Sequence, residues 1–306
     1  MKRRVIQIAD STQLISLPRR WALQNKIKKG DELEISENGN KIYISTGPQS
    51  EKNTKEVDVS NLSPIIPRIL HALYKVGYDE IKINFSNPDT LDIIQRRLQD
   101  EIIGFEIIEQ KSNYCVIKAF AGGVEAEFDV VLRRIFLLLK SMADGILEVI
   151  EKKDTSMIKS LRRLEANNNK YTGHCRRIIN KGLYNSKNIA IMYATVEELE
   201  KIADEYKYLC DFFIGNPKII LNVSKECQDT FKDINKFFDA CYELFYKFDM
   251  KKCAELFQKR KELITNVKKT WLKKKLSATD IALIHYYLVI LQKIANILSF
   301  KFEMEL

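Results

Sequence analysis

A chain of 306 residues is longer than one hydrophobic core usually organises, so two or three domains are expected. Its hydrophobic content of 45% and charged content of 30% are typical of a folded soluble protein and exclude a chain that is disordered throughout. The excess of 50 Lys and Arg over 41 Asp and Glu gives a net charge of +9 at pH 7, which favours polyanionic partners without proving any.

The front of the chain shows alternating apolar residues, which predict strands. The stretch "LISL" runs into Pro18, which lacks an amide hydrogen and tends to end a strand. A short helical stretch, "RRWALQNKI", follows, and the Gly-Asp pair at 30–31 makes a turn. Apolar residues alternate again over 33–44 around Asn38 and Gly39, so this pair is predicted to form a tight hairpin turn.

A linker and a small α/β unit are expected next. Residues 47–60, "GPQSEKNTKEVDVS", are polar and contain both Gly and Pro, which is typical of a linker. The order of elements over 61–122 suggests helices and strands on one sheet. We expect a helix near 63–76, a strand at 80–85, a helix at 88–99, and strands at 105–109 and 114–119.

From Val124 onward strand signals vanish and apolar residues recur at helical spacing. Connections of a few residues force consecutive helices to pack as antiparallel neighbours. An all-α domain is therefore predicted over 123–306, with two three-helix repeats at about 123–215 and 217–304 and a cap at Ser277 or Thr279. The six expected helices are 124–152, 156–183, 188–214, 218–247, 250–274 and 278–302.

The six cysteines include no CxxC pair, so neither a zinc ribbon nor a disulfide framework is indicated. Most of them lie in apolar helical contexts, as reduced core cysteines do, which predicts a cytoplasmic protein. The segment that comes closest to a membrane helix, 130–150, is interrupted by charged residues, and no long apolar core precedes Asp10. We therefore expect neither a membrane span nor a signal peptide.

The front segment, 1–47, is too small to be stable alone without a metal, disulfides or a partner. A second copy of the chain is the expected partner. The order of "LISLPRRWALQNKIKKGDELEI" and "ENGNKIYI" resembles the AbrB, MazE and SpoVT family of swapped-hairpin domains. This resemblance implies that two chains interlace their hairpins into one dimeric β-barrel that binds DNA.

Nine basic and five acidic residues between 1 and 46 leave a charge of +4, which in a dimer attracts phosphates. The chain departs from the family, with Gln13 and Leu14 where a Gly-Arg pair is frequent, and Ala22 and Leu23 where many members have two arginines. The alternative is that the charges are solvated positions on a module that only dimerises. The candidate DNA-binding residues are Arg3, Arg4, Arg19, Arg20, Lys26, Lys28 and Lys29.

The sharpest motif of the helical part is "ATVEELEKIADEYKYLCDFF". Glu197, Glu200 and Asp204 are spaced i, i+3, i+7 and share one helical face, where their repulsion requires bound cations or nearby Lys and Arg. Spacing alone favours a solvated acidic stripe. Carboxylates are also ligands for hard divalent cations and iron, so a metal is the alternative.

The segment "LEKIADEYKYL" resembles the ExxxD motif of the PhoU family, phosphate-uptake regulators made of two three-helix repeats. The resemblance implies a divalent metal or iron at the first repeat, with Glu165 and Asn169 of the preceding helix as further ligands. His174 is expected to be a hydrogen-bonded packing residue. Gln292 and Asn296 stand at the acid positions of the second repeat, where metal is expected to be lost.

No phosphate-binding loop, HExxH, GxSxG or triad spacing is present, so we expect no enzyme. Most of the chain resembles archaeal phosphate-uptake regulators that join an AbrB-like front to a PhoU-like bundle. The resemblance implies a cytoplasmic homodimer that couples phosphate status to transcription or transport, with the ATPase subunit of a phosphate transporter as a partner. The alternatives are a regulator of the transporter that does not bind DNA and, less favoured because antitoxins usually carry a short disordered tail, an antitoxin.

Overall fold

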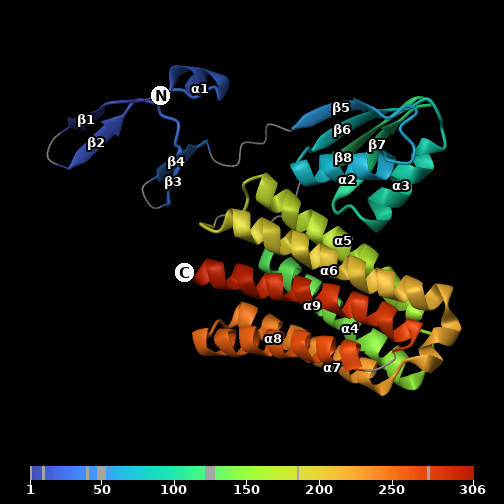
Figure 1. The fold of residues 1–306 in the computed structure, drawn as a ribbon. Helices are drawn as coiled ribbons and strands as arrows, with labels where there is room; N and C mark the ends of the chain where they lie inside the picture. Colours follow the sequence, from blue (N-terminus) through green and yellow to red (C-terminus); the bar gives the residue numbers. More distant parts are fainter. Residues whose placement is uncertain are drawn as a thin grey trace. The chain divides into compact units, whose positions relative to one another are not determined.

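The computed structural model describes residues 2–8, 11–38, 41–46, 53–120, 128–184, 186–273 and 276–306. The chain divides into two compact units, Met1–Lys52 and Asn53–Leu306. The described residues have a mixed α+β fold, as predicted. Small sheets lie before residue 120, and long helices follow from Phe128 onward (Figure 1).

The N-terminal unit contains two separate antiparallel strand pairs and one short helix. Its elements are β1 (Val5–Ile8), β2 (Thr12–Ile15), α1 (Arg19–Gln24), β3 (Glu34–Asn38) and β4 (Lys41–Ser45). β1 pairs with β2, and β3 pairs with β4, each pair forming a sheet of its own. The described residues of a single chain therefore form no closed barrel.

The turns of this unit follow from local chemistry. Gly30 has a φ of +95°, a left-handed value that glycine adopts without strain, and the Lys28 amide donates a hydrogen bond of 2.7 Å to the Asp31 carboxylate. The predicted Gly-Asp turn is thus confirmed. The hairpin prediction needs a correction, because pairing continues to Asn38, the last residue of β3; Gly39 lies outside the described residues.

The C-terminal unit begins with a four-stranded sheet in the order β5-β6-β8-β7. Its elements are β5 (Thr54–Asp58), α2 (Ile66–Val76), β6 (Glu80–Asn84), α3 (Thr90–Asp100), β7 (Phe105–Gln110) and β8 (Tyr114–Ala119). Both helices pack on one face of the sheet, where Leu70 of α2 and Ile94 of α3 share a core with Ile81 and Ile117 of the strands. The expected α/β order is confirmed within these residues.

The linker prediction for 47–60 is wrong over Thr54–Asp58. These residues form edge strand β5, which pairs in parallel with β6 in a register that places Val57 opposite Ile83. Val57 is the single partly buried residue of the strand, and its neighbours are exposed, so the segment carries no apolar alternation. The pairing partner, about 26 residues away in the chain, makes the segment a strand.

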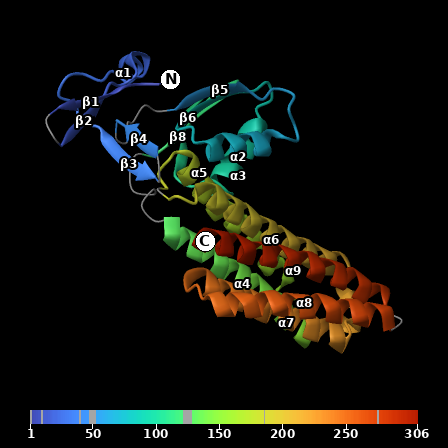
Figure 2. The ribbon, with the colours of Figure 1, turned by 60° about the vertical axis from the view of Figure 1, so that its left-hand side comes forward.

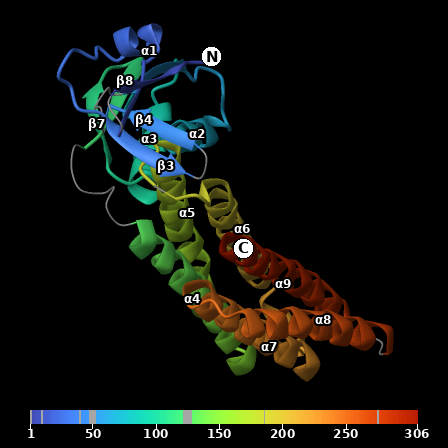
Figure 3. The same cartoon turned by 90° about the vertical axis from the view of Figure 1, so that its left-hand side faces the viewer.

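Six long helices follow within the described residues: α4 (Phe128–Lys152), α5 (Ile158–Asn180), α6 (Ile189–Gly215), α7 (Lys225–Tyr246), α8 (Met250–Lys273) and α9 (Ala278–Glu305). Their ranges are close to those predicted, except that the expected start at 124 lies outside the described residues. α6 packs on α9 and α4 on α7, and the helices lie side by side along their lengths (Figures 2 and 3).

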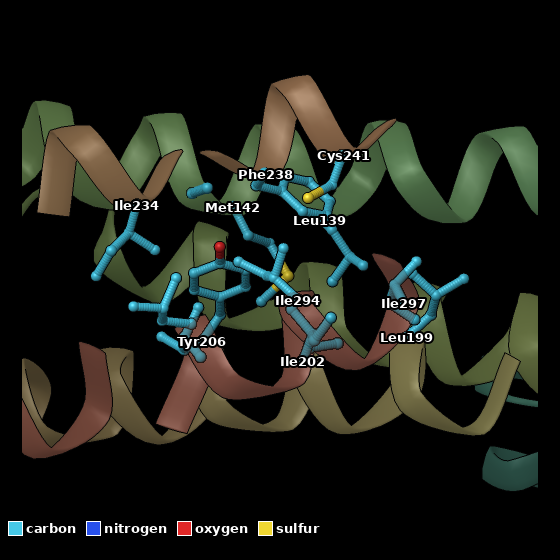
Figure 4. Packing of buried hydrophobic residues seen from close by; sticks show 14 of the residues in the cluster. Leu139, Met142, Leu199, Ile202, Tyr206, Ile234, Phe238, Cys241, Ile294 and Ile297 are labelled. Atoms are coloured by element: carbon cyan, nitrogen blue, oxygen red, sulfur yellow. The ribbon is translucent and has the colours of Figure 1, made fainter. Parts of the chain in front are cut away.

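One hydrophobic core joins these helices. Figure 4 shows Leu139 and Met142 of α4, Ile202 of α6, Phe238 of α7 and Ile294 of α9 converging on a common interior, and each is fully or almost fully buried. Burying one such side chain stabilises a fold by roughly 1.5–3 kcal/mol, so the apolar stripes recognised in the sequence supply the main driving force for packing here.

The predicted helix at 218–247 begins later than expected. Pro217–Asn222 forms a 3-10 helix, η1, and α7 follows Ser224, whose hydroxyl oxygen accepts a hydrogen bond of 3.3 Å from the Cys227 amide. Proline fixes the backbone and lacks an amide hydrogen, while a serine cap satisfies an amide at the start of a new helix. The proline therefore separates α6 from η1, and the serine cap starts α7 after η1.

The last helix, α9, is capped by Ser277 rather than Thr279, since the Ser277 hydroxyl oxygen accepts a hydrogen bond of 3.0 Å from the Asp280 amide. Among the described helices, α9 alone is long and apolar enough to cross a membrane by length and composition. The segment that comes closest to a membrane helix is therefore α9 and not 130–150, contrary to expectation. Half of the apolar window of α9 is buried inside the protein, as in a core helix.

Candidate nucleic-acid interface and carboxylate site

The two small sheets of the N-terminal unit leave their apolar side chains in solvent. Ile35 of β3 and Ile42 of β4 are 65% and 66% exposed, although they lie on strands that pair with each other. None of the described side chains of this unit is buried. Also exposed are Val5, Ile6, Ile8, Leu14, Ile15, Leu23 and Tyr43. The unit therefore presents an apolar surface that a single copy of it does not cover.

The seven candidate DNA-binding side chains are all exposed. Arg3 and Arg4 precede β1, Arg19 and Arg20 open α1, and the three lysines, Lys26, Lys28 and Lys29, follow that helix. None of the seven forms an ion pair with another described residue. The two arginines of α1 lie at its N-terminal end, which leaves their charges available to an external anion.

The predicted metal ligands lie on the facing sides of α5 and α6, together with two basic residues of the chain. We call Glu165, Glu197, Glu200 and Asp204 the carboxylate row. The Arg176 guanidinium of α5 contacts the carboxylates of both Glu197 and Glu200 on α6. The Arg176 side chain is only 5% exposed, so its buried positive charge is paired with two carboxylates.

The other half of the carboxylate row surrounds Lys207 of α6. Its ammonium lies 2.9 Å from a Glu165 oxygen and 2.6 Å from an Asp204 oxygen. Burial alone would lower the pKa of Lys207, but hydrogen bonds to Asp204 and Glu165 raise it above its ordinary value. Asn169 donates a 2.7 Å hydrogen bond from its amide nitrogen to the same Glu165 oxygen.

The arrangement does not fit a metal ion. The oxygens that would coordinate it face Arg176 and Lys207, and Asn169 directs its amide nitrogen, rather than a ligand oxygen, to Glu165. The described part of the chain contains no group of three or more His, Cys, Asp or Glu side chains arranged to hold a metal. The predicted metal site therefore stays a prediction that this geometry does not support.

Asn296, one of the two amide residues at the acid positions of the second repeat, pairs with a residue outside the carboxylate row. Asn296 of α9 donates a hydrogen bond of 2.9 Å to Glu198 of α6, which is 8% exposed. Glu198 directly follows Glu197 in the chain but belongs to the face that meets α9. This pair links two core helices and does not contribute to the carboxylate row.

A second polar cluster, between α5 and α2, was not predicted from the sequence. His174 is a buried packing residue, as expected, and its Nδ1 lies 3.0 Å from the Tyr74 hydroxyl of α2. The neighbouring Arg177 donates to the carbonyls of Tyr74 and Tyr78 at 3.0 and 2.7 Å and lies over the rings of Tyr74 and Phe105. The signal in the sequence was a pair of arginines between apolar residues.

Comparison with known proteins covers the front of the chain. The family model described as "Antidote-toxin recognition MazE, bacterial antitoxin" matches residues 6–52. No curated protein and no solved structure matches the chain. The N-terminal segment is therefore similar to the MazE antitoxins, in agreement with the swapped-hairpin resemblance of the same residues, and the match does not reach residues 53–306.

Proposed function

We propose that the chain is a dimeric DNA-binding regulator. The observation that carries the proposal is the exposed apolar surface of the N-terminal unit, where Ile35 and Ile42 remain about two-thirds exposed. A second copy of the unit that interlaces its hairpin would bury these side chains, each of which then contributes roughly 1.5–3 kcal/mol. Similarity to MazE antitoxins over residues 6–52 supports the same arrangement, a dimeric barrel.

Charge supports DNA as the ligand of this dimer. Arg19 and Arg20 are exposed at the N-terminal end of α1, outside any ion pair with the described residues. Two copies of the unit bring together four such arginines and a formal charge of about +8, which attracts a phosphate backbone with strong salt dependence. The missing family arginines at Ala22 and Leu23 point to backbone contacts rather than to extensive reading of bases.

We further propose that the helical part couples DNA binding to phosphate uptake. Six long helices lie within its described residues, and Glu200 and Asp204 belong to the third of them, α6. The resemblance of this segment to the PhoU motif supports the proposal. The proposed partner is the ATPase subunit of a phosphate transporter, and docking would alter how the paired hairpins meet DNA. The proposal also includes a cytoplasmic location and no catalytic activity.

The test uses full-length protein in which Arg19→Glu and Arg20→Glu are combined. We expect light scattering to give a dimer for both wild type and variant, and duplex binding, including the chain's own promoter region, to be lost in the variant alone. A matched control changes the exposed Lys252 and Lys259 of α8 to Glu, an equal change in charge. An equal loss of binding in the control, or a wild-type chain that is monomeric or ignores every duplex, contradicts the proposal.

The alternative is that the N-terminal unit only dimerises and the helical part regulates the transporter without DNA. The exposed Leu23, in a place where many relatives have arginine, favours it. In that case the double variant with Arg19→Glu and Arg20→Glu leaves phosphate uptake by the cell unchanged. Ile35→Asp, which prevents two copies of the N-terminal unit from pairing, abolishes the regulation of phosphate uptake. An antitoxin role predicts instead that the chain neutralises a toxin, which a growth-rescue assay detects.

A further inference from the structure

The carboxylate row brings four acidic side chains to one interface between α5 and α6. Glu165, Glu197, Glu200 and Asp204 would repel one another strongly if nothing neutralised them. Within the described residues, each of the four lies in contact with a basic side chain. Each carboxylate of the row therefore has a basic partner that the chain itself supplies.

Arg176 is held in place by its surroundings. Its side chain is 5% exposed, and its guanidinium contacts Glu197 and Glu200, while the Thr172 hydroxyl donates a 3.1 Å hydrogen bond to Glu200. The next residue, Arg177, is bound to α2. Because α5 packs against both α6 and α2, the Arg176 side chain is held in a buried position.

Lys207 of α6 pairs with the remaining two carboxylates of the row. Its side chain is 17% exposed, and it meets Glu165 of α5 and Asp204 of its own helix. The two cations thus divide the row into two sets, each with two carboxylates and one basic group. Lys201, whose ammonium is 3.6 Å from Glu197, adds a further positive charge at the exposed end.

We infer that Arg176 and Lys207 replace metal ions in this interface, so that the helical part folds and works without a bound metal. A divalent cation needs converging oxygens and would meet the positive charge of both basic groups. The inference does not depend on DNA binding, and it separates this chain from a bundle whose acidic motif recruits metal.

The first test measures metal in the full-length protein. Wild type is dialysed against EDTA, incubated with Mn²⁺ or Fe²⁺, passed over a desalting column and analysed by elemental mass spectrometry. We expect no stoichiometric metal and the same melting temperature in EDTA and in Mn²⁺. Stoichiometric Mn²⁺ or iron, or a melting temperature that EDTA lowers, overturns the inference.

The second test asks whether Arg176 is the counter-ion of the row. Arg176→Met is expected to lower the melting temperature by about 5–15 °C, because it removes the buried counter-ion of two carboxylates. Adding Glu197→Gln and Glu200→Gln should recover part of the lost melting temperature. If Arg176→Met alone fails to fold, the triple variant should regain a folded state. No recovery overturns the inference. The control combines the same two glutamines with Arg162→Met, whose exposed arginine pairs with Asp211 outside the row, and should show no recovery.

Discussion

The guanidinium of Arg177 on α5 donates a hydrogen bond of 2.5 Å to the carboxylate of Asp79, the residue before β6. The same side chain caps the C-terminal end of α2 through the carbonyls of Tyr74 and Tyr78. Lys181 joins Asp79 at 3.0 Å, and Asn180 donates to the carbonyl of Lys75 at 2.7 Å. One end of α5 therefore fastens the sheet and its helices to the helical core.

Removing this contact should destabilise the C-terminal unit. We expect Arg177→Met to lower the free energy of unfolding by about 2–4 kcal/mol, because the partly buried Asp79 carboxylate and two carbonyls lose a donor, although Lys181 still pairs with Asp79. Urea unfolding of the full-length chain measures it. Arg163→Met, at an exposed position of the same helix, should change stability by less than about 0.5 kcal/mol. Equal losses in the two variants would contradict a specific role of Arg177.

His71 of α2 should make stability depend on pH. Burial and the nearby charges of Lys75, Arg97 and Arg176 lower its pKa to about 4. They outweigh the Glu101 carboxylate, which has one oxygen 3.1 Å from His71 Nε2 and contacts Arg97 through the other. The unfolded chain binds a proton near pH 6.5 and the folded chain does not. The stabilisation is therefore present above pH 6.5 and is lost as the pH falls towards 4.

The His71→Gln variant should flatten that dependence. Between pH 6.5 and 4 the wild-type free energy of unfolding should fall by up to about 1.4 kcal/mol per pH unit from this residue alone. Chemical unfolding at several pH values gives the slope for both proteins. His285→Gln, at an exposed position of α9, controls for the loss of a histidine. Identical slopes in wild type and His71→Gln would refute the assignment.

Asp280 connects the starts of two helices. Its carboxylate accepts hydrogen bonds from the Ser277 hydroxyl at 3.0 Å and from the Ser224 amide at 3.2 Å, so it serves the caps of both α9 and α7. Asp280→Ala should lower the free energy of unfolding by about 1–3 kcal/mol. Thermal and urea unfolding measure the loss. Thr279→Ala, next to it but outside both caps, should be close to neutral, and a similar loss there would argue against the double cap.

The cysteines should be unreactive in the folded protein. All six are reduced and buried, and burial raises the pKa of Cys115 to about 11 and those of Cys210 and Cys227 to about 12. Since the thiolate is the reacting form, a thiol reagent such as Ellman's should label almost none of them at pH 8 in native buffer. All six should react in guanidinium chloride. Rapid native labelling of any one would show local opening around it.

Several features could be predicted from the sequence because they depend on neighbouring residues. Apolar spacing located the six helices, alternation located β3 and β4, and the Gly30 turn and the Ser277 cap follow from their own chemistry. The spacing of Glu197, Glu200 and Asp204 correctly put them on one helical face. Each of these signals depends on residues that are close together in the chain.

The tertiary structure decided which residues these helix faces and strands contact. The sequence alone determined that the carboxylate row needs positive charge, but packing of α5 against α6 decided that Arg176 and Lys207 supply it. The polar strand β5 likewise exists because of its pairing with β6. Local patterns set the direction of a side chain, whereas its burial and partners depend on segments brought together from far along the chain, as Tyr74 and His174 are across 100 residues.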